Sequence, residues 1–431
     1  MTTPTTLAPR GASLASAPSN RTLSESVEAD LYHPTTNPTG FINIGTAENY
    51  IMQPTIAAFT AAHPISLSAR NFSYGEGAWA TKRLRQGMAA HMNRALRPVV
   101  EIGERDLLMA NGVAGVCEML GFTLAEAGDG ILMGRPIYQA FPIDFGTRAK
   151  VEAVHVSFGD VDQFSPEAAA CYERALVQAE QHDGMKVRAL LLCHPHNPLG
   201  LCYPQATIIA LMQLCTKYKI HLISDEIYAM SVYNVPDSTA DGAIPFSSTL
   251  AFDSSDYIDP AYLHVMYGMS KDFAAGGLRV GCLYTRNEEL WRALSGMSVF
   301  SMSSVAGDLV ATAVLEDEGW LASFFATSRQ RLSERNQLAR TLLDAKGVPY
   351  RRGANAGFFI WAEFRRFLAG TGKEGWEAEG LLVERMMERK VYVTDGKSFG
   401  AEEPGWFRVI FSQEEDVMRE GLRRVFEAVG A

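Results

Sequence analysis

Short apolar runs alternate along this chain with longer segments in which apolar residues recur every three or four positions. Runs of this kind, bounded by glycine, proline or polar residues, are typical of buried β-strands, and the segments between them are typical of helices that bury one face. Strands that alternate with helices predict an α/β fold with a mostly parallel sheet. The runs that carry this pattern lie at residues 131–133, 189–193, 221–224 and 263–267.

A polar or aromatic side chain follows each of these runs: Tyr138, Asn197, Asp225 and Lys271. In open α/β sheets, ligands bind beyond the carboxyl ends of the strands, so these side chains predict one shared site. Taken singly, each has another interpretation. Asp225 could cap a helix, and Asn197 could occupy a turn before proline.

Lys271 lies in the stretch that is most indicative of chemistry, YGMSKDFAAGGLRVG at residues 267–281. It follows Ser270, precedes small residues that allow a close backbone approach, and stands eight positions before Arg279. A lysine at a strand end beside such a bend suits Schiff-base chemistry on a phosphorylated aldehyde, whose phosphate an arginine would hold. The same residues could instead be a surface lysine and a surface arginine that flank a loop.

Two further positions predict anion binding. Residues 111–115, NGVAG, open a helix, and the free N–H groups and positive dipole end of a helix start favour an anion. Small residues there could equally serve packing. Arg408 lies inside the apolar run 407–411, and a buried arginine is costly unless it is paired. It therefore either bridges a core carboxylate or binds an anionic ligand.

The two ends of the chain differ from its alternating centre. Residues 1–28 are rich in Thr, Ser, Ala and Pro, which predicts a disordered arm. Residues 39–50 then alternate apolar and polar positions before a glycine turn and Glu48. A long charged helix is predicted at about 328–346, and strands and helices alternate again beyond it.

The composition narrows the class of protein. Of 431 residues, 47% are hydrophobic and 20% are charged, with a net charge of −10, as in a globular protein with ample core. Without a basic run, a long apolar window or a signal-type N-terminus, we expect a cytoplasmic protein that binds neither nucleic acid nor membrane. The six cysteines form no C-x-x-C pair, and we expect reduced thiols in helices and strands of the core. His194 and His196 flank a proline and have no matching ligand pair, so we expect no metal site.

Four motifs in this order resemble the fold-type I pyridoxal-phosphate enzymes of the class I/II aminotransferase superfamily: HPHNPLG, SDEIY, SKDFAAGGLRVG and EPGWFRVIF. GFINIGTAEN at residues 40–49 is similar to the branch of the 1-aminocyclopropane-1-carboxylate synthases and their fungal relatives, which include enzymes of sulfur-containing secondary metabolism. The resemblance implies a large domain with a mostly parallel, seven-stranded sheet and a small α/β domain. The implied division is a disordered arm at 1–30, a segment joining the small domain at 31–70, a large cofactor-binding domain at 71–325 and a small domain at 326–431.

The resemblance also implies the roles of the residues around the cofactor ring. Lys271 would form a Schiff base with pyridoxal 5′-phosphate and then carry the substrate's Cα proton. Asp225 would pair with the protonated ring nitrogen. Asn197 and Tyr228 would hydrogen-bond the phenolic oxygen, and Tyr138 would stack on the ring.

The implied roles at the two ends of the site are as follows. Arg279, Ser270 and the amides of Val113 and Ala114 would bind the cofactor phosphate. Tyr74 would reach the phosphate of a neighbouring subunit, which implies a homodimer with shared sites. Arg408 would bind the α-carboxylate of an amino-acid substrate. Glu48 would lie at the substrate end, or it could only cap the segment that follows it.

Two positions depart from the family pattern. The family usually has a serine three residues before the lysine, where this chain has Gly268, and often a hydroxyl at the helix start, where it has Ala114. The phosphate would lose two side-chain donors, so we expect weaker cofactor binding.

Three functions are compatible with these residues. The leading one is a carbon–sulfur lyase that acts on a sulfur-containing amino acid, by γ-displacement from S-adenosylmethionine or by β-elimination from a cysteine conjugate. The second is an aminotransferase that uses the same residues. A binding protein without activity is disfavoured, because Lys271, Asp225 and Arg408 are all present.

Overall fold

A seven-stranded sheet forms the centre of the computed structural model, which describes residues 6–16, 21–181, 183–235 and 242–431. The strand order is β2-β8-β7-β6-β5-β3-β4, and only β8 runs antiparallel to its neighbours. This confirms the α/β class and the mostly parallel sheet. The strands are β2 (Leu107–Ala110), β3 (Gly130–Gly134), β4 (Glu152–Val156), β5 (Val187–Cys193), β6 (His221–Asp225), β7 (Leu263–Gly268) and β8 (Gly281–Thr285).

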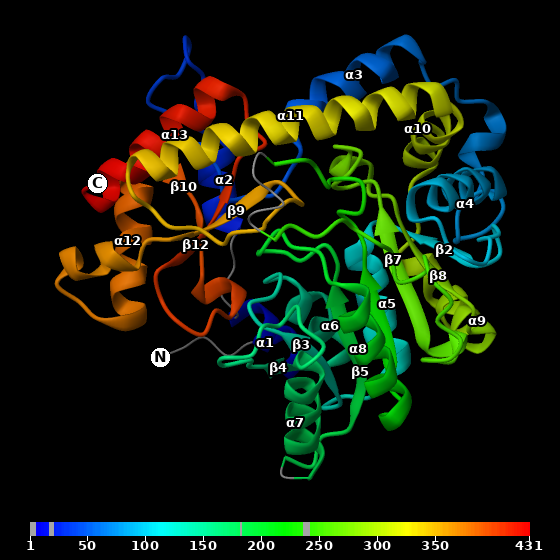
Figure 1. The fold of residues 1–431 in the computed structure, drawn as a ribbon. Coiled ribbons are helices and arrows are strands. Elements are labelled where there is room, and N and C mark those ends of the chain that lie inside the picture. The colour runs from blue at the N-terminus through cyan, green and yellow to red at the C-terminus, as the bar shows by residue number, and fades with distance from the viewer. Residues whose placement is uncertain (1–5, 17–20, 182, 236–241) are drawn as a thin grey trace.

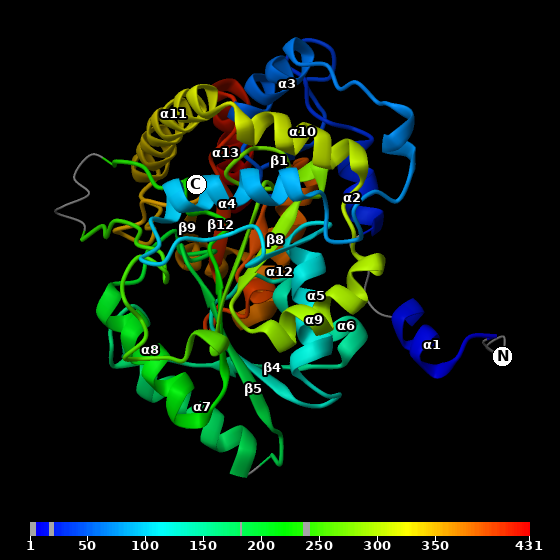
Figure 2. The same ribbon diagram turned by 90° about the vertical axis from the view of Figure 1, so that its right-hand side faces the viewer.

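Helices cover both faces of this sheet because its central strands are apolar on both sides. Alternate residues of β2 show the division: Leu107 and Met109 belong to one core cluster, and Leu108 and Ala110 belong to the other. One face carries α5 (Val113–Leu124), α6 (Phe141–Ala149) and α9 (Glu288–Met297). The other carries α4 (Lys82–Leu96), α7 (Ala168–Gln181), α8 (Gln205–Tyr218) and α10 (Val305–Glu316). Figure 2 shows α5, α6 and α9 on the opposite side of the sheet from α7 and α8.

Two smaller sheets lie beside the central one. In one, β11 (Thr394–Asp395), β12 (Trp406–Ile410) and β9 (Phe359–Glu363) pair antiparallel. In the other, β1 (Ile42–Asn43) pairs parallel with β10 (Val391–Tyr392), which brings an N-terminal segment against the C-terminal part of the chain. Helices α12 (Gly375–Glu388) and α13 (Glu415–Val429) pack beside these sheets.

The long helix α11 (Glu318–Ala345) extends from α10 to α13 across the top of the molecule (Figure 1). It begins ten residues before the predicted helix at 328–346, with Asp317 as its N-cap, whose side chain accepts a hydrogen bond from the Trp320 N–H. The predicted boundary at 325/326 falls inside this continuous helix. The division of the chain into domains stays a prediction.

The N-terminal region differs from the expected disordered arm. The structure describes α1 (Pro9–Ser16) and α2 (Arg21–Glu28) there, while residues 1–5 and 17–20 lie outside the described part. Helix α1 buries no side chain, whereas Val27 in α2 is buried. A helical pattern this short and rich in Ser and Ala carries too weak a periodicity to be found from the sequence. Helix α3 (Gln53–Ala62) follows the Glu48 loop.

All six cysteines are buried and free, as expected of reduced core thiols. The position of Cys202 differs from the expectation, because it lies in the loop before α8, outside any helix or strand. Among the residues that the structure describes, no helix is long and apolar enough to cross a membrane, and no group of His, Cys, Asp and Glu side chains could hold a metal ion.

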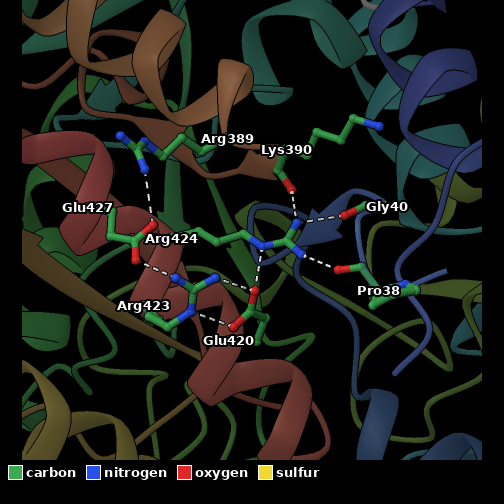
Figure 3. Close-up of polar contacts among 8 residues, drawn as sticks. All are labelled: Pro38, Gly40, Arg389, Lys390, Glu420, Arg423, Arg424 and Glu427. Atoms are coloured by element: carbon green, nitrogen blue, oxygen red, sulfur yellow. Dashed lines mark hydrogen bonds and ion pairs between the residues drawn. The ribbon is translucent and has the colours of Figure 1, made fainter. Parts of the chain in front are cut away.

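Arg424 on α13 fixes the N-terminal segment that leads into β1 (Figure 3). Its guanidinium is buried and donates to the carbonyl oxygens of Gly40 at 2.6 Å, Pro38 at 2.9 Å and Lys390 at 3.2 Å. Its Nε donates to Glu420 at 2.8 Å, and the Arg423 and Arg424 guanidinium groups lower the pKa of that carboxyl to about 2. One buried cation thus satisfies three carbonyl groups from two segments that are far apart in the sequence, residues 38–40 and Lys390.

We predict that Arg424→Met destabilises the fold by roughly 3–5 kcal/mol, because it leaves three backbone carbonyl oxygens without their donor. Arg423→Met is the matched control, since Arg423 pairs with the same Glu420 but its side chain is 53% exposed, and we expect at most about 1 kcal/mol. Urea unfolding of both variants measures the difference. Equal unfolding midpoints would show that the three carbonyl contacts contribute nothing.

Candidate active site

A cavity lies where β3, β5, β6 and β7 end and where α5 begins. Parallel strands bring their carboxyl ends to one edge of the sheet, so the residues that follow them meet there. Nine of the twelve residues that the sequence analysis selected line this cavity: Val113, Ala114, Tyr138, Asn197, Asp225, Tyr228, Ser270, Lys271 and Arg279.

Lys271 stands on a loop that a buried carboxylate holds in place. Its Nζ donates to the carbonyl oxygen of Ala47 at 2.6 Å. The next residue, Asp272, accepts hydrogen bonds from the Ser231 Oγ at 2.5 Å and from the Tyr267 hydroxyl at 2.9 Å. The loop that carries Lys271 is thereby attached to the loop that follows Tyr228. The sequence analysis missed Asp272, because adjacent residues in a loop give no signal of which one turns inward.

The pKa of Lys271 falls to about 8, because burial disfavours the ammonium and Arg408 repels it. Glu48 and Asp225 act in the opposite sense, and both carboxylates raise the pKa of the amine. A lysine with this pKa is partly neutral near pH 7 and can act as a nucleophile or a base.

Asp225 is buried at the end of β6, where it accepts a hydrogen bond from the Ile227 N–H at 3.2 Å. Burial raises the pKa of this carboxyl to about 7. A cation placed against it would stabilise the ionised form, so the position suits a protonated ring nitrogen. The Tyr228 hydroxyl is also buried, and within the described residues it has no hydrogen-bond partner. Unpartnered buried groups of this kind fit a site that a polar ligand completes.

Arg408 lies below the cavity lining and is 2% exposed. It donates to the Asn197 Oδ1 at 3.0 Å and to the carbonyl oxygen of Gly45 at 2.6 Å. Its Nε has no partner within the described residues, and it forms no ion pair with a carboxylate there. Of the two alternatives from the sequence, the core carboxylate is therefore not found among these residues, and a donor remains for an anion.

Glu48 lies outside the cavity lining, on the loop whose Ala47 carbonyl contacts Lys271. The Gln53 Nε2 donates to the Glu48 carboxylate at 2.8 Å, and the Ser412 hydroxyl donates to the Glu48 carbonyl. Tyr74, which the resemblance placed at a neighbouring subunit's phosphate, is 93% exposed and does not line the cavity of its own chain.

The start of α5 has no side-chain cap, and this leaves the amides at Val113 and Ala114 available to an anion. Gly112, the N-cap, has φ 97° and lies against the Arg279 guanidinium, where a Cβ would stand 2.4 Å from the Arg279 Nη2. Arg279 has φ 54° and donates to the Gly276 carbonyl at 3.0 Å. The glycine thus allows the guanidinium to reach the helix start.

Gly268 has a packing reason to replace the serine usual in the family. A Cβ at this position would lie 2.8 Å from the Val280 carbonyl oxygen and 2.9 Å from the Gly281 Cα, because β7 and β8 pair closely here. Asp144 on α6 also lines the cavity, and the sequence analysis missed it. Burial raises the pKa of Asp144 to about 6, while Arg279 acts to lower it.

A lysine, a buried carboxylate and an arginine around one cavity, at the carboxyl edge of this sheet, define the class of fold-type I pyridoxal-phosphate enzymes. The chain belongs to the aminotransferase class I and II family, whose model matches residues 41–425, and within it to the branch similar to the 1-aminocyclopropane-1-carboxylate synthases. Pyridoxal phosphate is therefore the cofactor.

Curated relatives include 1-aminocyclopropane-1-carboxylate synthase 3 of Oryza sativa subsp. japonica, 32% identical, with 89% of this chain and 86% of the relative covered. Another is the probable aminotransferase gliI of Aspergillus fumigatus, 32% identical, with 90% and 89% covered. Among solved structures, the Thermus thermophilus aspartate aminotransferase double mutant 1 matches with a TM-score of 0.72 at 18% identity, covering 98% of this chain and 99% of that one. At this identity, the similarity to the Thermus thermophilus structure shows only that the two proteins share a fold.

We predict that uptake of pyridoxal phosphate by apoprotein accelerates as pH rises and levels off above about pH 8. The neutral amine is the reactive form of Lys271, so the rate should follow deprotonation at the lowered pKa of about 8. Borohydride trapping at a series of pH values, followed by peptide mapping, measures labelling at Lys271. Lys271→Ala should abolish labelling of this peptide. A rate that continues to climb toward pH 10 would contradict the lowered pKa.

Proposed function

We propose that this protein is a pyridoxal-phosphate-dependent carbon–sulfur lyase that acts on a sulfur-containing α-amino acid. The observation that carries the proposal is the position of Glu48: its loop contacts Lys271 through Ala47, and its charge raises the pKa of the lysine. A carboxylate at this place attracts a cationic group on the substrate side chain, such as a sulfonium or an ammonium.

The residues present fit the cofactor. Asp225 would hold the ring nitrogen, Asn197 and Tyr228 the phenolic oxygen, and Tyr138 the ring face. The phosphate would bind Arg279, Ser270 and the amides of Val113 and Ala114. Bound pyridoxal phosphate supplies an aldehyde that condenses with amines and a ring that accepts electrons from a substrate carbon.

The substrate would be oriented by the buried cation and deprotonated by the lysine. Arg408 would bind the α-carboxylate through its free Nε, which fixes the Cα hydrogen relative to Lys271. Lys271 Nζ, with a pKa near 8, would take the Cα proton. In a β-elimination, the carbon–sulfur bond then breaks, its electron pair goes to sulfur, and the thiolate leaves as a thiol after it accepts the proton that Lys271 took from Cα; a sulfonium would leave as a neutral thioether.

An aminotransferase is the second candidate. One relative at 32% identity has the name probable aminotransferase gliI, and solved neighbours of the fold are aspartate aminotransferases. The same lysine, carboxylate and arginine serve both reactions. Elimination needs a substrate that carries a leaving group and transamination does not, so the product distinguishes the two reactions.

We also propose a cytoplasmic homodimer with shared sites. The exposed Tyr74 would reach the cofactor phosphate of the partner, which explains why so large an aromatic side chain is 93% exposed in the single chain. A place in sulfur-containing secondary metabolism fits a fungal-type relative.

The function is tested by offering S-adenosylmethionine, cysteine S-conjugates and common amino acids separately. We expect release of thiol or methylthioadenosine while the cofactor stays in its aldehyde form. Glu48→Gln should lower kcat/KM for the cationic substrate by roughly tenfold to a hundredfold, because it removes one partly buried charge. Glu126→Gln, exposed just beyond the end of α5, is the matched control and should change nothing. Keto-acid formation with conversion to the pyridoxamine form, insensitive to Glu48→Gln, would favour the aminotransferase.

A second prediction concerns the phosphate. Arg279→Ala should lose cofactor on dialysis, because Gly268 and Ala114 offer no hydroxyl and a charge-assisted contact is about twice as strong as a neutral one. Arg97→Ala is the control, since Arg97 is also exposed and has the same left-handed backbone, φ 51° against 54°. Absorbance of the dialysed proteins gives the occupancy. Full retention by Arg279→Ala would show that the amides and Tyr74 suffice.

A further inference from the structure

A second cavity of about 650 Å³ lies at the opposite edge of the central sheet from Lys271. It is bounded by α4, the start of β2, the end of β8 and the start of α9. Four arginines line it: Arg85, Arg105, Arg286 and Arg292. The proposed reaction uses none of them.

These arginines are not neutralised by the chain. None of the four forms an ion pair within the described residues, although the protein as a whole carries a net charge of −10. The Arg85 Nε is buried and has no partner there, while its Nη1 donates to the Glu104 carbonyl at 3.2 Å. The Glu104 carboxylate faces Lys82 instead, at 3.8 Å.

The acidic groups at the cavity do not balance the charge. Asp106 and Glu288 are the two carboxylates of its lining, against four guanidinium groups. Asp106 already accepts a hydrogen bond from the Gly103 N–H at 2.8 Å. Like charges held together repel, so an excess of two positive charges around one cavity favours an anion.

Two tryptophans supply an apolar wall. The rings of Trp79 and Trp291 are 6.0 Å apart and inclined at 56°, so they form a corner. The Trp291 Nε1 donates to the Leu107 carbonyl at 3.4 Å, which fixes that ring. An indole face beside guanidinium groups suits a planar ring that carries an anionic group.

We propose that this cavity binds a small molecule in which a planar heterocycle carries phosphate, with the phosphate on the arginines and the ring on the tryptophan corner. The volume lies in the range of small-molecule sites, and guanidinium groups bind phosphate through paired hydrogen bonds. Two sources share this chemistry, a nucleotide and a second molecule of pyridoxal phosphate.

Titration calorimetry on the holoenzyme tests the site, with ADP, adenosine and inorganic phosphate as probes. ADP should bind more tightly than adenosine or inorganic phosphate, because only ADP contacts both the arginines and the tryptophans. Its affinity should fall as the salt concentration is raised. The double variant Arg105→Ala, Arg292→Ala should bind ADP about a hundredfold more weakly, since two charge-assisted contacts are lost. Both side chains are exposed, so their removal spares the fold. Arg10→Ala with Arg97→Ala makes the same charge change away from the cavity and should leave the affinity unchanged.

Competition identifies the source. Displacement of ADP by pyridoxal phosphate would assign the cavity to a second cofactor molecule, and resistance to it would assign a nucleotide. The proposal is overturned if ADP shows no binding up to about 1 mM, a very weak affinity. It is also overturned if phosphate alone binds as tightly as ADP, or if the arginine pair changes the oligomeric state while ADP does not bind.

Discussion

The contacts of the Arg408 guanidinium are the interaction on which the active site depends. They join three parts of the chain: Gly45 in the N-terminal segment, Asn197 after β5 of the central sheet, and β12 of a smaller sheet. A buried cation is costly to desolvate, and burial lowers the pKa of this guanidinium. The aromatic rings of Phe399 and Phe359, with centroids 4.7 and 5.5 Å from its Cζ, repay part of that cost. The Arg408 Nε has no partner within the described residues, so part of the desolvation cost is not offset by the protein. An anionic ligand bound to this Nε would offset it and stabilise the site.

The N-terminal segment is held at both ends, and this positions the Glu48 loop. Arg424 fixes Pro38 and Gly40 at one end, and Arg408 fixes Gly45 at the other. Between them, β1 pairs with β10. Two residues beyond Gly45, the Ala47 carbonyl accepts a hydrogen bond from the Lys271 Nζ at 2.6 Å. The Glu48 loop is held from its other side by Ser412, whose hydroxyl donates to the Glu48 carbonyl and whose carbonyl accepts from the Ile51 N–H.

The sequence predicted the strands and the residues at their ends, because local patterns encode them. It did not predict contacts between residues that are distant in the sequence. The strand ends that carry Tyr138, Asn197, Asp225 and Lys271 were found because apolar runs and their polar successors are adjacent in the sequence. Asp272 and Asp144 were missed, since their surroundings include Ser231 and Arg279 respectively, which only the folded chain brings near. The helices α1 and α2 were missed because their short patterns give little periodicity. The arginine cavity was also invisible, because its members lie about two hundred residues apart in the sequence.

The glycines between β7, β8 and the start of α5 explain why this chain lacks the serine that is usual in the family at position 268. At Gly281, a Cβ would stand 2.6 Å from the Val113 N, and at Gly268 it would meet the Val280 carbonyl. The backbone of β7, β8 and the α5 start is therefore packed without room for side chains. A serine at 268 would displace Val280 and Gly281, and Gly281 packs directly against the start of α5. The absence of that hydroxyl is thus a consequence of close backbone approach, and the groups that remain at this end of the cavity are the amides of Val113 and Ala114, Ser270 and the Arg279 guanidinium.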